Sequence, residues 1–84
     1  MIPYEFTSSS DKKLRKLSLN IQRQIIKKIE FFLGSPKPLY FAEPLVGRKQ
    51  VAYRYRINDY RVIFELAEGK VTIIDIGKRD SIYE

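Results

Sequence analysis

The stretch VAYRYRINDYRVIFEL, residues 51 to 66, carries the strongest structural signal in the sequence. Two runs rich in β-branched and aromatic residues flank Asn58-Asp59, a dipeptide that favours a tight turn. A turn of two residues between two such runs is typical of a β-hairpin. The stretch therefore predicts paired antiparallel strands at 51–57 and 60–66.

The predicted register gathers three arginines on one face of this hairpin. Alternate residues of a strand point to opposite faces, so Arg54 and Arg56 share one face and the tyrosines between them share the other. A two-residue turn places Arg61 directly opposite Arg56, with Arg54 diagonally within reach. Like charges that face each other across a ladder are unfavourable by roughly 0.2–1 kcal/mol. A bound phosphate would offset this repulsion and suits the planar donors of arginine, whereas a merely solvated face is the alternative that charge geometry leaves open.

A third strand follows the hairpin. The run VTIIDIG, residues 71–77, is rich in β-branched residues and comes after Glu68-Gly69, a second turn signal. Continuing the pairing through that turn predicts which residues of the third strand join the arginine face. These are Thr72, Ile74, Ile76 and Lys78.

The N-terminal half has helical periodicity. A short strand at 2–6 precedes a short helix predicted at 9–17, where several hydroxyl side chains could cap the first turn. Apolar residues then recur at spacings of four, four and three, which predicts an amphipathic helix at 18–33. Residues 34–50 hold three prolines and no sustained period, so we expect a loop in which a strand could begin near Leu45.

These elements predict an α+β fold in the order β-α-α-β-β-β. An N-terminal helical hairpin packs on a small, mainly antiparallel sheet. A chain of 84 residues is long enough for one domain, which we expect to span 1–84.

Composition limits the chemistry and the partners. The chain carries 16 Lys and Arg against 10 Asp and Glu, a net charge of +6 that favours a polyanionic partner such as RNA, DNA or an acidic protein. It has no cysteine and no histidine, so we expect no disulfide, no catalytic metal and no cofactor. No basic and apolar leader opens the sequence, and no run approaches the roughly 20 apolar residues that cross a bilayer. We therefore expect a cytoplasmic protein without a membrane partner.

The whole pattern resembles the RelE branch of the RelE/ParE toxin superfamily. The resemblance rests on the order of the elements, on Leu45 and Gly47 before the last three strands, on the tyrosine–arginine hairpin at 53–63, and on Ile76-Gly77-Lys78-Arg79 followed by Tyr83. It implies a toxin of a type II toxin–antitoxin system, held inactive by a cognate antitoxin. It also implies a ribosome-dependent endoribonuclease, an mRNA interferase that cuts mRNA in the ribosomal A site and so inhibits translation.

In that family the 2′-hydroxyl of a ribose attacks the adjacent phosphate without a metal. The resemblance implies that Arg61 and Arg79 hold the scissile phosphate and that Tyr83 stacks on a base or assists proton transfer. Arg54 and Arg56 stand where relatives can carry lysines. Further candidates for binding RNA phosphates are Lys78, Arg48 and Lys49.

The general base and the branch of the superfamily stay open in the sequence. An arginine, with a pKa above about 12, is a poor proton acceptor. Tyr83, Glu84, Lys78 or a group of the ribosome or of the RNA remain as candidates for that role. A ParE-like toxin that binds DNA gyrase without cleaving RNA is an alternative, and a non-catalytic domain that binds RNA or ribosomes is another. An antitoxin is expected to carry an acidic or amphipathic segment that crosses the basic sheet or displaces the C-terminal tail.

Overall fold

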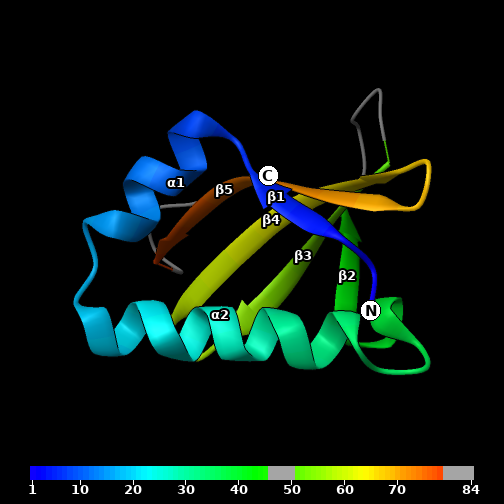
Figure 1. The fold of residues 1–84 in the computed structure, drawn as a ribbon, viewed down its shortest axis with the longest axis horizontal. Coiled ribbons are helices and arrows are strands. Elements are labelled where there is room, and N and C mark those ends of the chain that lie inside the picture. Colours follow the sequence, from blue (N-terminus) through cyan, green and yellow to red (C-terminus); the bar gives the residue numbers. More distant parts are fainter. Residues whose placement is uncertain (46–50, 79–84) are drawn as a thin grey trace.

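Five strands form one sheet, and two helices cover one of its faces (Figure 1). The computed structural model describes residues 1–45 and 51–78. In chain order the elements are β1 (Tyr4–Phe6), α1 (Ser8–Arg15), α2 (Leu19–Leu33), the 3-10 helix η1 (Pro38–Phe41), β2 (Ala42–Leu45), β3 (Ala52–Ile57), β4 (Tyr60–Ala67) and β5 (Lys70–Lys78).

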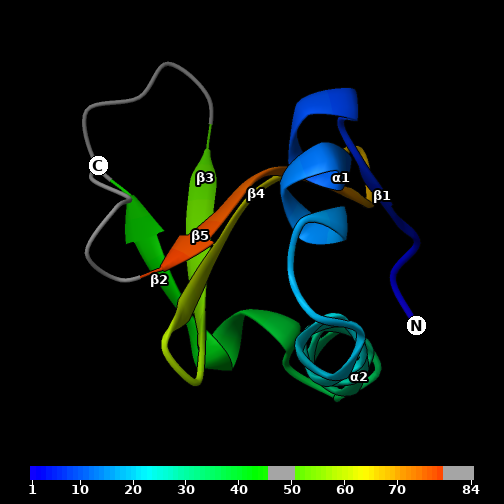
Figure 2. The ribbon, with the colours of Figure 1, turned by 90° about the vertical axis from the view of Figure 1, so that its left-hand side faces the viewer.

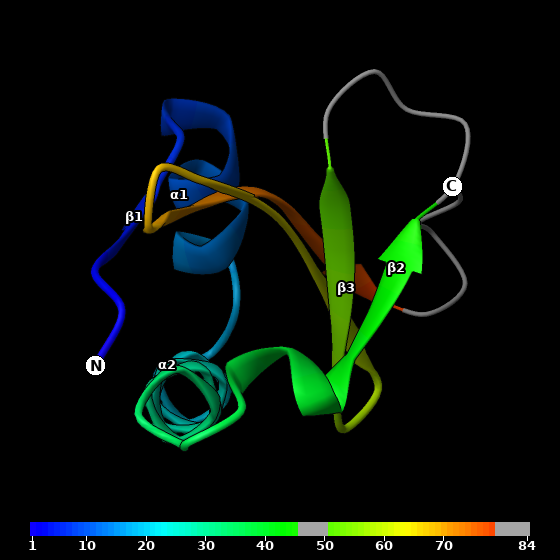
Figure 3. The ribbon, with the colours of Figure 1, turned by 90° about the vertical axis from the view of Figure 1, so that its right-hand side faces the viewer.

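The sheet has the strand order β1-β5-β4-β3-β2. The short strand β1 pairs with β5 in parallel, and the other neighbours are antiparallel. Seen along two opposite directions, α1 and α2 both lie on the same side of the sheet, which leaves the other face uncovered by helices (Figures 2 and 3). The predicted α+β class and the mainly antiparallel sheet are confirmed.

The helices begin where hydroxyl side chains cap them and pack through one apolar stripe. The side chain of Thr7 accepts from the backbone N–H of Ser10, and the side chain of Ser18 accepts from the N–H of Ile21. The stripe of α2 packs against the apolar side chains of the sheet, as the spacing of its residues predicts. The core so formed contains Leu14, Ile25, Ile29, Phe32, Leu33, Tyr55, Ile57, Val62, Phe64, Val71, Ile73 and Ile76.

A buried hydroxyl fastens α1 to the sheet. Ser10 is fully buried, and its Oγ donates to the backbone carbonyl of Ile73 in β5 at 2.7 Å. The backbone N–H of Thr7 donates to the same carbonyl at 3.0 Å. Both contacts fix the start of α1 on β5, so the helix layer has a defined position over the sheet.

The structure adds a strand to the predicted order. Residues 42–45 form β2, which pairs with β3 at the sheet edge, where a loop is predicted. Pro44 obscures this strand in the sequence because proline is rare within sheets, but an edge strand tolerates it. The three prolines of the segment also hide η1, which begins at Pro38.

The predicted register of the hairpin is confirmed: Arg56 lies opposite Arg61 and Ile57 lies opposite Tyr60. The prediction for β5 is wrong beyond its first half. Ile63 pairs with Asp75 while Phe64 pairs with Ile73, so the pairing shifts by one residue in a β-bulge.

This bulge changes the face of the later β5 residues. Thr72 stays opposite Glu65, but Ile76 pairs with Val62 and is buried beneath the helices. Lys78 lies opposite Tyr60 and so belongs to the same face of the sheet as the tyrosines. Neither Ile76 nor Lys78 therefore joins the arginines as predicted.

Asp75 of β5 links the sheet to the helix α1. Its Oδ1 accepts from Lys13 Nζ of α1 at 2.6 Å and from the backbone N–H of Ile76 at 2.9 Å. The described part of the chain contains no helix long and apolar enough to cross a membrane.

Candidate functional site

Arginines of β3 and β4 gather on the sheet face that the helices leave uncovered. The side chain of Arg56 is 59% exposed and that of Arg54 is 18% exposed, whereas Arg61 as a residue is only 7% exposed. Arg54 lies opposite Ile63 and Arg56 opposite Arg61, so all three belong to one face of the antiparallel pair. We call these three residues the arginine cluster.

A carboxylate from the edge strand enters this cluster. Glu43 of β2 lies directly opposite Arg54, and its Oε1 accepts from Arg54 Nε at 3.1 Å and from Arg56 Nε at 3.0 Å. The terminal Nη2 of Arg54 also lies 3.0 Å from the same oxygen. The anion that the facing arginines require is therefore present in the chain itself, so a phosphate is not the sole way to offset their repulsion.

The arginines keep Glu43 ionised. Partial burial acts to raise the pKa of this carboxyl, but the hydrogen bonds from Arg56 and Arg54, together with their charges, outweigh it and hold the pKa below its ordinary value. Glu43 is nonetheless 43% exposed, so solvent and solutes reach it. It is an accessible carboxylate held between two guanidinium groups.

Arg61 is the most buried member of the arginine cluster. Its Nη1 donates to the backbone carbonyl of Tyr60 at 3.4 Å, and its partner across the β4–β5 ladder is Gly77. A buried guanidinium has few accessible rotamers, and this order suits a group that must stay in place. The geometry makes Arg61 the fixed member and Arg56 the accessible one.

Several predicted site residues lie outside the described part of the chain. These are Arg79 and Tyr83, which are predicted to act in catalysis, Arg48 and Lys49, which are predicted to bind phosphate, and the base candidate Glu84. Of the predicted residues that are described, Arg54, Arg56 and Arg61 come together, while the register separates Lys78 from them. Across residues 1–45 and 51–78, His, Cys, Asp and Glu side chains form no group of three that could hold a metal ion.

Sequence reasoning missed Glu43. It falls in the proline-rich segment that is predicted to be a loop, and nothing in a loop prediction places a side chain against a strand. Residues 42–45 show no alternation of apolar and polar side chains, because Ala42 and Leu45 lie on opposite faces of the strand, so the segment carries no strand signal of its own. An edge strand at that place would put Glu43 beside the arginines.

The chemistry available at the site is anion binding next to a proton acceptor. Guanidinium groups donate several parallel hydrogen bonds to phosphate oxygens. A carboxylate within the same cluster can accept a proton from a hydroxyl that binds there.

Comparison with known proteins identifies the fold and the family. The family model described as "ParE toxin of type II toxin-antitoxin system, parDE" matches residues 4–83. No curated protein sequence matches the chain. Among solved structures, a chain of the archaeal RelE-RelB complex from Pyrococcus horikoshii OT3 is similar at 23% identity and a TM-score of 0.76, covering 98% of this chain and 100% of that one.

Two further solved structures are similar to this chain over most of its length. The isolated E. coli RelE toxin is 24% identical with a TM-score of 0.74, covering 93% of this chain and 84% of that chain. A chain of the RelBE2 toxin–antitoxin complex from Mycobacterium tuberculosis is 23% identical with a TM-score of 0.73, covering 93% and 98%. At these identities the likeness shows a shared fold. Since the family model spans nearly the whole sequence, the chain belongs to the ParE toxin family of type II toxin–antitoxin systems, within the RelE/ParE toxin superfamily.

Proposed function

We propose that this toxin is a ribosome-dependent endoribonuclease that cleaves mRNA in the A site and is held inactive by an antitoxin. The observation that carries the proposal is the arginine cluster, in which Arg54, Arg56 and Arg61 share one sheet face with the carboxylate of Glu43. Three guanidinium groups suit the phosphate of an RNA backbone, and the carboxylate suits the 2′-hydroxyl beside it.

In the proposed reaction Glu43 accepts the proton of the ribose 2′-hydroxyl. The 2′-oxygen forms a bond to the adjacent phosphorus, and the bond from phosphorus to the 5′-oxygen breaks. The leaving 5′-oxygen takes a proton from Tyr83 or from water, which gives a 5′-hydroxyl end and a 2′,3′-cyclic phosphate. Arg61 and Arg79 stabilise the negative charge that develops on the phosphate, a contribution of about 10²–10³ in rate for each well-placed donor.

Substrate binding would itself activate Glu43. In the free chain Arg54 and Arg56 donate to this carboxylate and lower its pKa, which weakens it as a base. A phosphate that takes over these donors removes the cause of the lowered pKa, so the pKa of Glu43 rises as the substrate arrives. The proposed base is thus weak until a phosphate occupies the arginine cluster.

The antitoxin follows from the family and from related structures. The chain belongs to a toxin family of type II systems, and the similar structures from Pyrococcus horikoshii and Mycobacterium tuberculosis are complexes of a toxin with its antitoxin. We therefore expect the partner of this chain to be an antitoxin, and the cytoplasm, with its ribosomes and mRNA, to be its place of action.

Expression of the toxin in growing cells tests the proposal. We expect growth arrest, together with cuts in a reporter mRNA that primer extension maps to positions within codons being translated. The Arg61→Ala variant should lose both effects. Growth arrest with an intact reporter mRNA would remove the nuclease proposal.

A second candidate function has a specific observation in its favour. The matching family model is that of ParE toxins, and binding of DNA gyrase is the activity expected of a ParE-like toxin. The same cells provide the test, because inhibited gyrase changes the supercoiling of a plasmid. Relaxed plasmid with intact reporter mRNA would favour this function, and cut mRNA with normal supercoiling would exclude it.

A further inference from the structure

A cluster of exposed aromatic side chains lies where α2 meets η1. Phe31 is 59% exposed, Tyr40 is 78% exposed and Phe41 is 41% exposed. The ring centroid of Phe41 is 6.0 Å from that of Phe31 and 5.2 Å from that of Tyr40, so the three rings are contiguous. We call them the aromatic surface. Large apolar side chains gathered in this way usually mark an interaction site.

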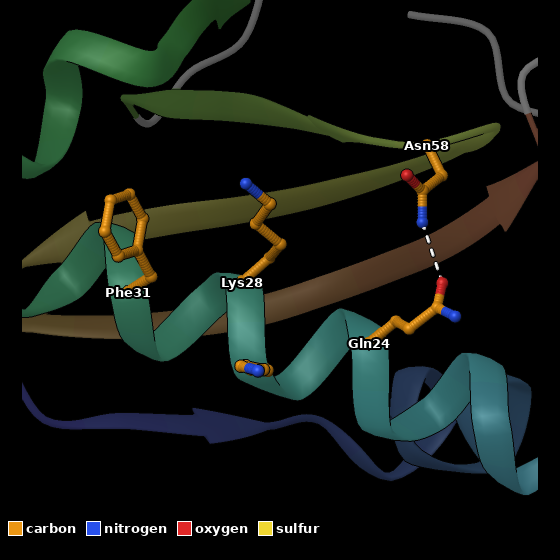
Figure 4. A pocket seen from close by; sticks show the side chains of 5 residues that line it. Gln24, Lys28, Phe31 and Asn58 are labelled. Atoms are coloured by element: carbon orange, nitrogen blue, oxygen red, sulfur yellow. Dashed lines mark hydrogen bonds between the residues drawn. The ribbon is translucent and has the colours of Figure 1, made fainter.

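A groove adjoins the aromatic surface on each side. One, of about 410 Å³, runs along α2 and is lined by Gln24, Lys27, Lys28, Phe31 and Asn58. In this groove Phe31 and Lys28 project from α2, and Asn58 of the β3–β4 turn donates to Gln24 at 2.9 Å across its far end (Figure 4).

The second groove, of about 300 Å³, is lined by Ser35, Pro36, Lys37, Tyr40 and Phe41. Three lysines therefore edge the two grooves, and no carboxylate is among the residues that line either of them. The edges of this surface are basic, while its centre is apolar.

The aromatic surface is separate from the arginine cluster. Phe31 belongs to α2, which covers the opposite face of the sheet (Figure 3). Phe41 stacks on the core residue Phe32 with ring centroids 4.7 Å apart, which ties it to the helix side. A ligand at the aromatic surface therefore leaves the arginine cluster accessible, and the two can have different partners.

The packing of the rings favours a protein segment over RNA. Single-stranded RNA stacks its bases on free aromatic faces. Here one face of Phe41 is covered by Phe32, and the ammonium group of Lys28 lies 5.5 Å from the centroid of the Phe31 ring. The ring of Tyr40 stands at 89° to that of Phe41, so the rings form no common stacking platform. Tilted rings beside grooves instead accept aliphatic or aromatic side chains of a peptide.

We propose that the aromatic surface anchors an acidic, amphipathic segment of the inhibitory partner, an inference that rests on the antitoxin of the proposed function. Apolar side chains of the segment fill the grooves beside Phe31 and Tyr40, and its carboxylates meet the ammonium groups of Lys27, Lys28 and Lys37. The partner thus holds the toxin at a place remote from the arginine cluster.

The test uses the protein encoded by the reading frame next to that of this chain, purified together with it. Calorimetry measures the affinity of this partner for the native toxin and for the double variant Phe31→Ala/Tyr40→Ala, whose side chains are exposed enough to be removed without unfolding the chain. We expect the double variant to bind the partner at least about tenfold more weakly, because aromatic anchors dominate such interfaces. The charge-reversed variant Lys27→Glu/Lys37→Glu should also bind more weakly.

Matched controls change the same chemistry elsewhere. Leu19→Ala removes another exposed apolar side chain of α2, and Lys12→Glu reverses a charge on α1, and both should keep the native affinity. Binding of a 12-nucleotide oligouridine is measured in parallel. The proposal is overturned if the double variant binds the partner as tightly as the native toxin, or if it loses oligouridine binding and keeps the partner.

The outcomes separate this inference from the proposed function. A toxin that cuts mRNA, but whose double variant keeps native affinity for the partner, contradicts only the inference. A toxin that does not cut mRNA, but whose double variant loses the partner, contradicts only the nuclease. Absence of any complex between the native toxin and the neighbouring protein overturns the inference and the antitoxin together.

Discussion

Glu43 contacts two arginines at once, and this limits what each of them can bind. Arg54 offers its Nε and Nη2 to the carboxylate, while Arg56 offers Nε and keeps 59% of its side chain exposed. A phosphate can therefore first reach Arg56 without displacing the carboxylate, and must compete with Glu43 for Arg54. The same carboxylate that relieves repulsion between the arginines weakens their binding of other anions.

Neutralising this carboxylate should affect binding and catalysis in opposite directions. In Glu43→Gln the competing charge is gone, so we expect RNA to bind at least as tightly as to the native chain. Cleavage should slow by about 10²–10⁴ because the proposed general base is lost. Filter binding and single-turnover cleavage measure the two effects. Weaker binding with unchanged cleavage would show that Glu43 only supports the sheet.

Arg56 should act as a phosphate contact that is insensitive to RNA sequence. We expect Arg56→Ala to weaken RNA binding and to lower the slope of log affinity against log salt concentration by about one. Arg15→Ala is the matched control, because Arg15 is also exposed and also pairs with one carboxylate, Asp11 at 2.8 Å. Equal losses for both variants would place the RNA contact outside the arginine cluster.

The elements differ in how far their sequence predicts them. The hairpin of β3 and β4 is predicted with its register, because a two-residue turn and alternating side chains fix it locally. The strand β2 is not predicted, since its four residues include Pro44 and form a strand only by pairing with β3, where Glu43 lies opposite Arg54 and Pro44 lies opposite Tyr53. The prediction for the face of Ile76 is wrong for a different reason. A β-bulge adds one residue to β5, and no signal within VTIIDIG marks it.

The same limits apply to the candidate site. Arg54, Arg56 and Arg61 are predicted together because one hairpin contains all three. Glu43 and the face of Lys78 are missed, because their positions depend on the pairing of β2 with β3 and on a bulge between β4 and β5, and neither has a signal in the sequence.

The attachment of α1 to β5 depends on a hydroxyl that is easily removed. We expect Ser10→Ala to lower the free energy of unfolding by about 1–2 kcal/mol, because its Oγ is buried and donates to the Ile73 carbonyl. Ser9→Ala, one residue earlier on an exposed position of the same helix, should have almost no effect. Chemical denaturation of both variants measures the difference. Equal stability of the two would mean that α1 is held by its apolar contacts alone.

The molecule as a whole should be sensitive to alkaline conditions. Burial raises the pKa of Tyr55 to about 12, and burial together with the hydrogen bond to Glu30 raises the pKa of Tyr4 to about 12. Because an unfolded tyrosine titrates near 10, stability is complete below about pH 10 and falls as the pH rises from there towards 12. Tyr55 alone can contribute a slope of up to about 1.4 kcal/mol per pH unit.

Denaturation at pH 8, 10 and 11 measures this slope. The Tyr55→Phe variant lacks the ionisable hydroxyl that donates to the Pro38 carbonyl at 2.8 Å, so its stability should depend less on pH. Tyr40→Phe, which changes an exposed residue, is the matched control. A slope that is the same for all three proteins would contradict the role of the buried tyrosine.

Two candidate surfaces lie on different parts of this small fold. The arginine cluster lies on the face of the β3–β4 pair opposite the core residues, and the aromatic surface lies where α2 meets η1. A toxin so arranged can meet RNA with its sheet while an antitoxin is anchored on its helical side. In the proposed function, the arginine cluster is the place where the toxin binds and cleaves RNA.

Single-turnover cleavage of mRNA on purified, programmed ribosomes is the sharpest test of this role of the arginine cluster. The native toxin should cut within the A-site codon and leave a 5′-hydroxyl end, and Arg61→Ala should cut at least about 100-fold more slowly, with thermal unfolding confirming that the variant is folded. Arg61→Lys, which keeps the charge without the planar fork, should lie between them, and Arg15→Ala should match the native rate. If the native toxin leaves ribosome-bound mRNA intact, or if folded Arg61→Ala cuts it equally fast, the arginine cluster is not the cleavage site.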